Sequence, residues 1–552
     1  MILQRVAALL CFTPLAAVAA GADRHYPITG VPVDPRAGGV PLRRNIDELE
    51  AVGGEQWDLF IRSLLAMHEA PASDEFSYFQ IAGIHGKPFT EWNSSGKKKA
   101  DGWQGYCPHN EKIFLPWHRT FVLLYEQVLV EQAKRLARDY PHRYRYQYMQ
   151  AAENLRSPYW DWGLGHGVPQ ATVPETIRIR IPKGEILEET EVSNPLVTFR
   201  FPPEVLDGPY SDFDPSNRTQ IYRCPSPEKY PDSANKDLSR RPYKNWIYEC
   251  FTRAENYSDF ASTSDRGISL EQIHNGIHWD GACGGQFLAT EFSAFDPLFM
   301  LHHTNVDRLW AYWQAISPDH GIFHEPYLGS SRFSTPNGTT ISTDSPLEPF
   351  YKSDKDFHST RSVSRIRDLG YSYFGLEHWE KSEAQMKHDA QGVINRLYGP
   401  NATDPEPLIQ INKSTTTRFM AHVQLDVSGL DRPCTLEFYL GPKHAGSFVV
   451  MAQPEEGMLY GGIPLTKAIG ESGMRWMAAT SIVQWIQSSL EISVLKRGGE
   501  QISLGSVSGL EVEIESAYFL RPKAEGELPA HNQSTRWPVR VKERTEVATG
   551  GE

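Results

Sequence analysis

Apolar residues recur at helical spacing in four stretches of the first 316 residues. In the first, from about Asp47 to His68, Trp57, Phe60 and Ile61 fall on one face, as in a helix with one buried side. The others are the run from about His118 to the residue before Pro141, "SLEQIHNGIHWD" (269–280) and "LFMLHHTNVDRLWAYWQAI" (298–316). The pattern therefore predicts a mainly α-helical N-terminal part.

The hydrophobic pattern changes after "GYSYFGLEHWE" (370–380). Segments such as "HVQLDVSGL", "CTLEFYLG", "EISVLKRGG" and "LEVEIESAYF" alternate apolar and polar residues between glycine-containing turns, which is typical of strands. We expect a mainly α domain over 21–380, a linker over 381–412, and an all-β sandwich domain over 413–552. Residues 166–260, rich in proline and charge, are expected to be a long, loop-dominated insertion.

Composition narrows the class of protein. A chain of 552 residues is too long for one ordinary core, which agrees with two domains. The net charge of -13 is spread without long runs, which makes nucleic acid an unfavourable partner. No segment reaches the roughly 20 apolar residues of a membrane-spanning helix.

The first 20 residues resemble a secretory signal peptide, with Arg5, an apolar run and small residues around Ala17 to Ala20. Sequons for N-glycosylation agree with that route. They are Asn93, Asn217, Asn256, Asn337, Asn401, Asn412 and Asn532. We expect a mature chain that starts near Gly21, enters the secretory pathway and is secreted.

Removal of the signal leaves an odd number of cysteines: Cys107, Cys224, Cys250, Cys283 and Cys434. A bridge between Cys224 and Cys250 is possible, but the connectivity cannot be assigned from the sequence, and one sulfur must lack a disulfide partner.

Histidines concentrate in the predicted helices and their flanks, within apolar surroundings. They are His85, His109, His118, His274, His278, His302 and His303. A lone His85 is ordinary, and the H-x3-H spacing of His274 and His278 alone is a weak signal. Burying several imidazoles without partners costs about 1–3 kcal/mol each, however, and a shared metal removes that cost.

The type of metal follows from what accompanies the histidines. The E-x-x-H pairs of di-iron bundles are absent, and Asn275 rather than glutamate follows His274, unlike the H-E-x-x-H of zinc hydrolases. Imidazole suits copper, among other metals, and two sets of three histidines favour two copper ions. A zinc hydrolase remains the alternative for this cluster.

The chain resembles the fungal tyrosinases, which belong to the type 3 copper proteins together with catechol oxidases and molluscan haemocyanins. The segments "HNEKIFLPWHRTFVLLYE" and "DPLFMLHHTNVD" are similar to the two copper signatures of that family. "YPITGV", "PYWDW" and "YSYFG" are similar to further family markers, over residues 25–380. The β-domain resembles the C-terminal domain of the longer fungal enzymes.

The resemblance implies a role for individual residues. It implies that His85, His109 and His118 bind one copper, that His274, His278 and His303 bind the other, and that His302 is a packed neighbour. It places Cys107 in a thioether bond with the ring of His109. It also gives Glu271 and Asn275 the task of holding a water that helps to deprotonate a phenol, although an exposed helical Glu271 is the alternative.

Asp307 follows His303 by one helical turn. Its carboxylate would either orient an imidazole or pair with an arginine such as Arg119 or Arg308.

The activity that the resemblance implies uses dioxygen to hydroxylate monophenols and to oxidise o-diphenols to o-quinones. Substrates would be small phenols or tyrosyl residues, for instance in the synthesis of melanin or a secondary metabolite. Alternatives are a catechol oxidase or o-aminophenol oxidase without the hydroxylation step, and a haemocyanin-like oxygen carrier. The C-terminal domain would act as a lid or pro-domain, whose removal by proteolysis between about Gly375 and Lys413 raises activity.

Overall fold

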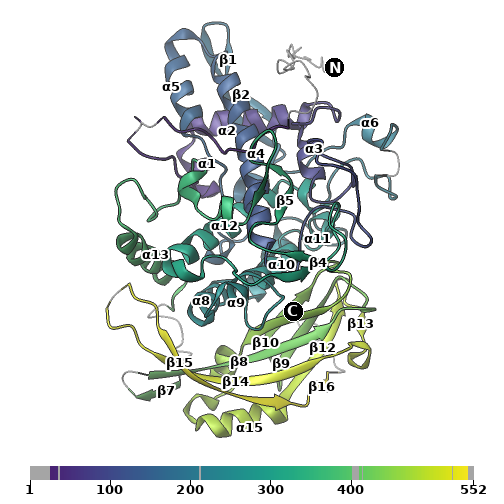
Figure 1. The fold of residues 1–552 in the computed structure, drawn as a ribbon, viewed down its shortest axis with the longest axis vertical. Helices are drawn as coiled ribbons and strands as arrows, with labels where there is room; N and C mark the ends of the chain where they lie inside the picture. The colour runs from purple at the N-terminus through teal and green to yellow at the C-terminus, as the bar shows by residue number, and fades with distance from the viewer. Residues whose placement is uncertain are drawn as a thin grey trace.

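The computed structural model describes residues 25–544 apart from 35, 37, 211–212, 401–408, 413–414 and 525. The expected signal peptide therefore lies outside the described residues, as does Asn401. A mainly helical domain is followed by a β-sandwich, which confirms the predicted fold class (Figure 1). The sandwich packs next to helices α8 and α10, and the hairpin β1–β2 lies at the opposite end of the molecule (Figure 1).

Thirteen helices occur among the described residues of the first domain. They are α1 Ile46–Val52, α2 Gly54–Glu69, α3 Tyr78–Gly83, α4 Phe114–Ala137, α5 His142–Asn154, α6 Pro203–Leu206, α7 Asp232–Arg240, α8 Tyr243–Arg253, α9 Tyr257–Ala261, α10 Leu270–Asp280, α11 Gly285–Leu288, α12 Leu298–Ile316 and α13 Glu383–Tyr398. The short strands are β1 Thr176–Lys183, β2 Ile186–Ser193, β3 Tyr327–Gly329, β4 Thr339–Ile341, β5 Pro346–Tyr351 and β6 Phe357–Ser359.

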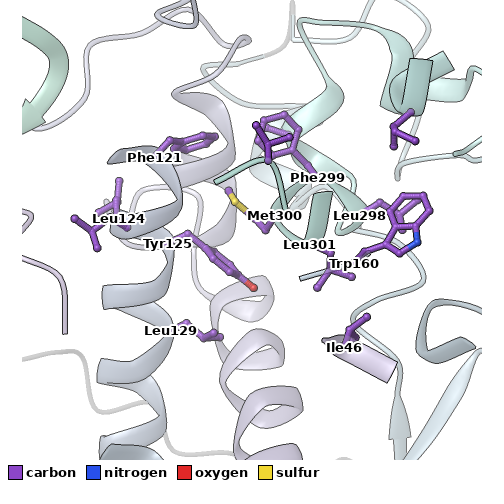
Figure 2. Close-up of a cluster of buried hydrophobic side chains, with 14 of the residues drawn as sticks. Ile46, Phe121, Leu124, Tyr125, Leu129, Trp160, Leu298, Phe299, Met300 and Leu301 are labelled. Carbon is purple, nitrogen blue, oxygen red and sulfur yellow. The ribbon is translucent and has the colours of Figure 1, made fainter. Parts of the chain in front are cut away.

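Helices α4 and α12 form the centre of this domain. Figure 2 shows Phe121 and Tyr125 of α4 facing the first turn of α12, where Phe299 and Met300 lie. These side chains are almost completely buried, and burial of each large apolar side chain stabilises the fold by about 1.5–3 kcal/mol. A buried apolar core thus supports the two helices that carry His118 and His303.

Three expectations for the helical domain were wrong. The predicted helix 47–68 is two helices, because Gly53 takes a φ of 61°, which ends α1 before α2 begins. The stretch 166–260 is not loop-dominated, since it contains β1, β2 and α6 to α9. The expected linker 381–412 begins with α13, a capped helix that packs against α8 and α12.

The C-terminal domain consists of two five-stranded sheets around a common apolar core. One sheet has the order β10-β9-β12-β13 with β16 beside β12, and the other has the order β11-β8-β14-β15 with β7 beside β8. The strands are β7 Ile409–Asn412, β8 Thr415–Asp426, β9 Cys434–Leu440, β10 Lys443–Val450, β11 Met458–Pro464, β12 Leu490–Lys496, β13 Gln501–Ile502, β14 Glu511–Leu520, β15 Ala530–Val539 and β16 Lys542–Glu543. Two helices that the strand pattern did not predict, α14 Thr466–Glu471 and α15 Ala479–Ser489, also belong to this domain.

Candidate metal centre

The first three predicted ligands form a nearly regular triangle. His85 lies just after α3, His109 precedes α4, and His118 lies in the second turn of α4. The ring centres are 5.6 Å apart in each of the three pairs. Imidazoles that bind one ion at about 2.0 Å have ring centres about 5 Å apart, so one metal ion fits this set.

The second set is tighter. His274 and His278 come from one face of α10 and His303 from α12, and the Nε2 atom of His274 lies 3.0 Å from that of His278 and 3.2 Å from that of His303. Nitrogens that bind the same ion at tetrahedral angles are about 3.3 Å apart. A cation placed between the three Nε2 atoms would therefore bind their lone pairs, which otherwise face one another.

Backbone carbonyls set the tautomer of three of these rings. An Nδ1–H group donates from His85 to Thr290 O (3.1 Å), from His118 to Phe114 O (2.8 Å) and from His278 to Phe287 O (2.7 Å). The proton on Nδ1 leaves the lone pair on Nε2, which is the arrangement that a metal requires. The Nε2 atoms of His85 and His118 are buried without a partner among the described residues.

Burial also keeps the six rings neutral. Desolvation lowers the pKa of all six imidazoles, with His109 brought to about 3 and His278 to about 4. The six side chains are between 0 and 7% exposed. Because metal ligation needs the neutral ring, no proton has to be removed at physiological pH.

The two sets face each other. His118 stacks on His303 with ring centres 4.5 Å apart, and His109 lies 6.1 Å from His274. Phe114 lies against His118 and His274, and Phe299 lies against His303, so apolar rings line the space around the imidazoles. The donor set and its spacing fit two adjacent copper ions.

His302 lies in the same cluster as the second set. Its ring stacks on that of His274 at a centre distance of 4.9 Å, and neither ring nitrogen has a partner among the described residues. The expectation of a packed neighbour stays a prediction for this residue.

Helix α10 presents the second set together with Glu271 and Asn275. Glu271, His274, Asn275 and His278 follow the spacing i, i+3, i+4, i+7, so they share one face. Asn275 Oδ1 accepts the Nδ1–H of His274 at 2.9 Å. Glu271 is buried rather than exposed, and this burial raises its pKa to about 7.

Two residues that the sequence interpretation passed over hold Glu271. The backbone N–H of Asn110 donates to Glu271 Oε1 (2.6 Å), and the backbone N–H of Thr263 donates to Oε2 (2.9 Å). The only local signal was that Asn110 follows His109 directly, as Asn275 follows His274.

Sulfur placement corrects one expectation. Cys224 forms a disulfide with Cys283, not with Cys250, which stays a buried free thiol. Cys107 is also free and buried, and its Sγ lies 3.6 Å from Nδ1 of His109.

Among the described residues, the hydrogen-bond and ion-pair partners of Asp307 include no imidazole. Asp307 forms ion pairs with Arg119 and with Arg43 (2.9 Å), and accepts hydrogen bonds from Tyr371 (2.8 Å) and Tyr373 (2.6 Å). The "YSYFG" motif therefore anchors the last loop of the helical domain to α4 and α12.

The predicted glycosylation sites differ in exposure. Asn217, Asn256, Asn337 and Asn532 are exposed, and the side chain of Asn412 is not described. Asn93 is only 6% exposed, and its Nδ2 donates to Tyr26 O at 3.0 Å, which makes it the least accessible of the described sites. No helix among the described residues is long and apolar enough to cross a membrane.

The chain matches two family models. Residues 75–316 match "Common central domain of tyrosinase" and residues 419–514 match "Tyrosinase C-terminal domain". A tyrosinase of Podospora anserina is 30% identical over 446 residues, which cover 74% of this chain and 76% of that protein. A tyrosinase of Neurospora crassa is 32% identical over 69% of this chain, and the match spans 59% of that relative's length.

Solved structures show the same fold. A recombinant mushroom tyrosinase superposes with a TM-score of 0.79 over 94% of this chain and 100% of that chain, at 23% identity. The likeness includes both the helical domain and the sandwich.

Proposed function

The chain belongs to the tyrosinase family, and on that basis we propose that it hydroxylates monophenols at the ortho position and oxidises o-diphenols to o-quinones with dioxygen. The observation that supports this most strongly is the pair of facing imidazole triads, which are buried and neutral, with four of the six rings held by an Nδ1–H bond that leaves Nε2 free for a metal. Six imidazoles without a carboxylate suit a redox copper pair better than a hydrolytic zinc.

The residues that hold copper follow from the geometry. His85, His109 and His118 would bind one ion, and His274, His278 and His303 would bind the other. When bound, the copper pair transfers electrons from the phenol to dioxygen, so that one monophenol and one dioxygen give one o-quinone and one water.

Glu271 is proposed to accept the phenol's proton, through a water that it holds together with Asn275. A free phenol has a pKa of about 10 and is mostly protonated at neutral pH. Because burial raises the pKa of Glu271 to about 7, its carboxylate is a stronger base than an exposed one and is still ionised above that pH. Hydroxylation of monophenols should therefore rise as the pH increases through about 7.

Cys107 is proposed to form a thioether with the ring of His109, which lies within reach of its Sγ. The bond replaces one S–H and one C–H, and dioxygen takes up the two electrons and two protons. Peptide mass spectrometry would detect the linked pair as a loss of two hydrogen atoms.

The C-terminal domain is proposed to keep the enzyme latent. Val449 and Met451, at and just after the end of β10, pack on Trp279 and Leu288. Trp279 directly follows the proposed ligand His278, so the sandwich would cover this side of the site. Cleavage of the chain between α13 and β7 should therefore raise activity, and equal activity of intact and cleaved protein would contradict the lid.

One experiment tests the function itself. Purified protein is loaded with copper, the metal is quantified, and turnover of tyrosine is compared with that of the matching o-diphenol. Two copper ions per chain with turnover of both substrates support the proposal. Turnover of the diphenol alone indicates a catechol oxidase, and reversible oxygen binding without turnover indicates a carrier.

The role of Glu271 has its own test. Glu271→Gln keeps the size of the side chain but removes the base, so monophenol turnover should fall by about 100-fold relative to diphenol turnover. An unchanged ratio would remove Glu271 from the mechanism. The physiological phenol and secretion from the cell also stay proposals that rest on the family resemblance.

A further inference from the structure

Strand β11 is the edge strand of its sheet, and its outer edge faces the helical domain. One side of β11 pairs with β8, so the groups on the other side must find partners elsewhere or remain unsatisfied. These groups are satisfied by the helical domain. Met458 O accepts a hydrogen bond from Asn110 Nδ2 (3.1 Å), and Tyr460 N donates one to Thr263 O (2.9 Å). Gly462 exchanges two hydrogen bonds with the Gln272 side chain (2.8 and 2.9 Å).

Two of these partners also hold Glu271. The N–H groups of Asn110 and Thr263 donate to the two carboxylate oxygens of Glu271, and the Thr263 hydroxyl lies 3.2 Å from Oε2. The same hydroxyl lies 3.1 Å from Asn110 Oδ1, which links the two loops to each other. Asn110 and Thr263 therefore each connect β11 directly to the carboxyl group of Glu271.

The conformation of Asn110 makes it sensitive to such a contact. Its φ is 57°, in the left-handed region that asparagine tolerates better than most residues. The hydrogen bond from its Nδ2 to Met458 O fixes the side chain, and the backbone N–H then points at Glu271. Without that bond, the loop after His109 has fewer restraints.

We propose that Asn110 is a positioning residue for Glu271, and that the outer edge of β11 fixes Asn110 and Thr263. The sandwich domain then sets the place of the carboxyl group in addition to covering the site. This inference rests on the proposed function, in which Glu271 accepts the phenol's proton.

Kinetics of Asn110→Gly test the positioning role. Glycine keeps the positive φ and the backbone N–H but removes both side-chain bonds of Asn110. Ser94→Gly is the matched control, because Ser94 also has a positive φ (51°) and lies exposed in a loop without a bond to Glu271. All variants are loaded with copper, cleaved between α13 and β7, and assayed with the two pieces left together.

We expect Asn110→Gly to lower the ratio of monophenol to diphenol kcat/KM by about tenfold, and Ser94→Gly to leave it unchanged. In a chain that already carries Glu271→Gln, Asn110→Gly should lower the ratio no further, because the two changes act on one interaction. A ratio that falls only in Glu271→Gln overturns the inference and leaves the proposed function intact. A ratio unchanged in both variants overturns both.

Hydrogen exchange of the full, uncleaved chain tests the role of β11 without activity. Tyr460 lies opposite Gln424 and its N–H points away from β8, so Tyr460→Pro removes the bond to Thr263 and none in the sheet. Tyr460→Ala is the control, because it removes the same side chain and keeps the N–H. Segments 109–113 and 262–265 should exchange faster in the proline variant than in the alanine variant, and equal exchange would refute the coupling to β11.

Discussion

At the scale of the residue, hydrogen-bond acceptors on the far side of the imidazole rings orient the site. Carbonyl groups accept the Nδ1–H of His85, His118 and His278, and Asn275 accepts that of His274. These bonds fix ring orientation and tautomer before any metal arrives, and such outer partners raise metal affinity by about 10- to 100-fold.

His302 and His303 offer a matched pair of substitutions. His303→Asn removes the Nε2 that lies 3.2 Å from His274 Nε2, so the chain should retain about half of its copper. His302→Asn, one position earlier in the same buried helix, should keep both ions. Copper analysis of the two purified variants distinguishes them, and equal losses would show that His302 also binds metal.

The metal-free chain should be sensitive to acid. Burial lowers the pKa of the six imidazoles, so the unfolded chain binds more protons than the folded chain below about pH 6.5. The free energy of unfolding therefore falls as the pH drops from about 6.5 towards 4, and His278 alone, with a pKa of about 4, accounts for about 3 kcal/mol.

Urea unfolding of the metal-free protein at several pH values measures this effect. His278→Gln should show a weaker dependence on pH than the unsubstituted chain. A midpoint that stays constant between pH 7 and 4.5 would contradict the expected proton uptake.

At the scale of the element, α10 combines the chemistry with the domain contact. Its i, i+3, i+4, i+7 stripe carries two proposed ligands and the proposed base, while Gln272 on another face binds β11. The spacing of the stripe could be predicted from the sequence, because helical periodicity is local. The contact with β11 could not, since it depends on a strand residue 190 positions further along the chain.

Gly462 permits the close approach of β11 to the helical domain. A Cβ atom there would lie 2.8 Å from the backbone nitrogen of Ile268 and 2.7 Å from Sδ of Met420. Gly462→Ala should weaken the domain contact by about 1–3 kcal/mol and raise the diphenol activity of the uncleaved chain several-fold. Gly470→Ala in α14, with no atom within 4 Å of the added methyl group, is the control. Equal activity in both variants would contradict the proposed docking.

The disulfide ties the end of α10 to the insertion. Cys283 lies three residues after Asp280, and its bond to Cys224 closes a loop with a sequence separation of 59. A chain with both cysteines replaced by serine should lose about 4 kcal/mol of unfolding free energy. Thermal unfolding measures the loss, with Cys250→Ser as the control for a buried free thiol.

At the scale of the whole molecule, two domains share an interface rich in buried charge. Arg253 pairs with Glu515 (2.9 Å), Arg418 with Glu249 (3.4 Å) and Arg497 with Asp237 (2.5 Å), in each case across the domain boundary. The first two pairs are almost fully buried, so a change of relative orientation that broke them would leave buried charges with fewer partners.

The fold class, the sandwich and the gathering of the histidines in one place could be predicted from the sequence, since periodicity, motif spacing and family resemblance are carried by short segments. The assignment of the ligands to two copper ions stays a proposal. The Cys224–Cys283 pairing and the bonds of Asn110 could not be predicted from the sequence. Both join segments far apart along the chain. The hydrogen bond between the Asn93 amide and the backbone of Tyr26 could not be predicted for the same reason.

The outer edge of β11 has a consequence for the fate of the sandwich after cleavage. Once separated, that strand would expose the unpaired backbone groups of Met458, Tyr460 and Gly462, and its Gly461–Gly462 pair offers no charged side chain to repel a neighbouring strand. Unpaired strand edges of this kind pair with strands of other molecules, so the released domain should aggregate or be degraded. Maturation would then be a one-way event, with no intact inhibitor left to bind again.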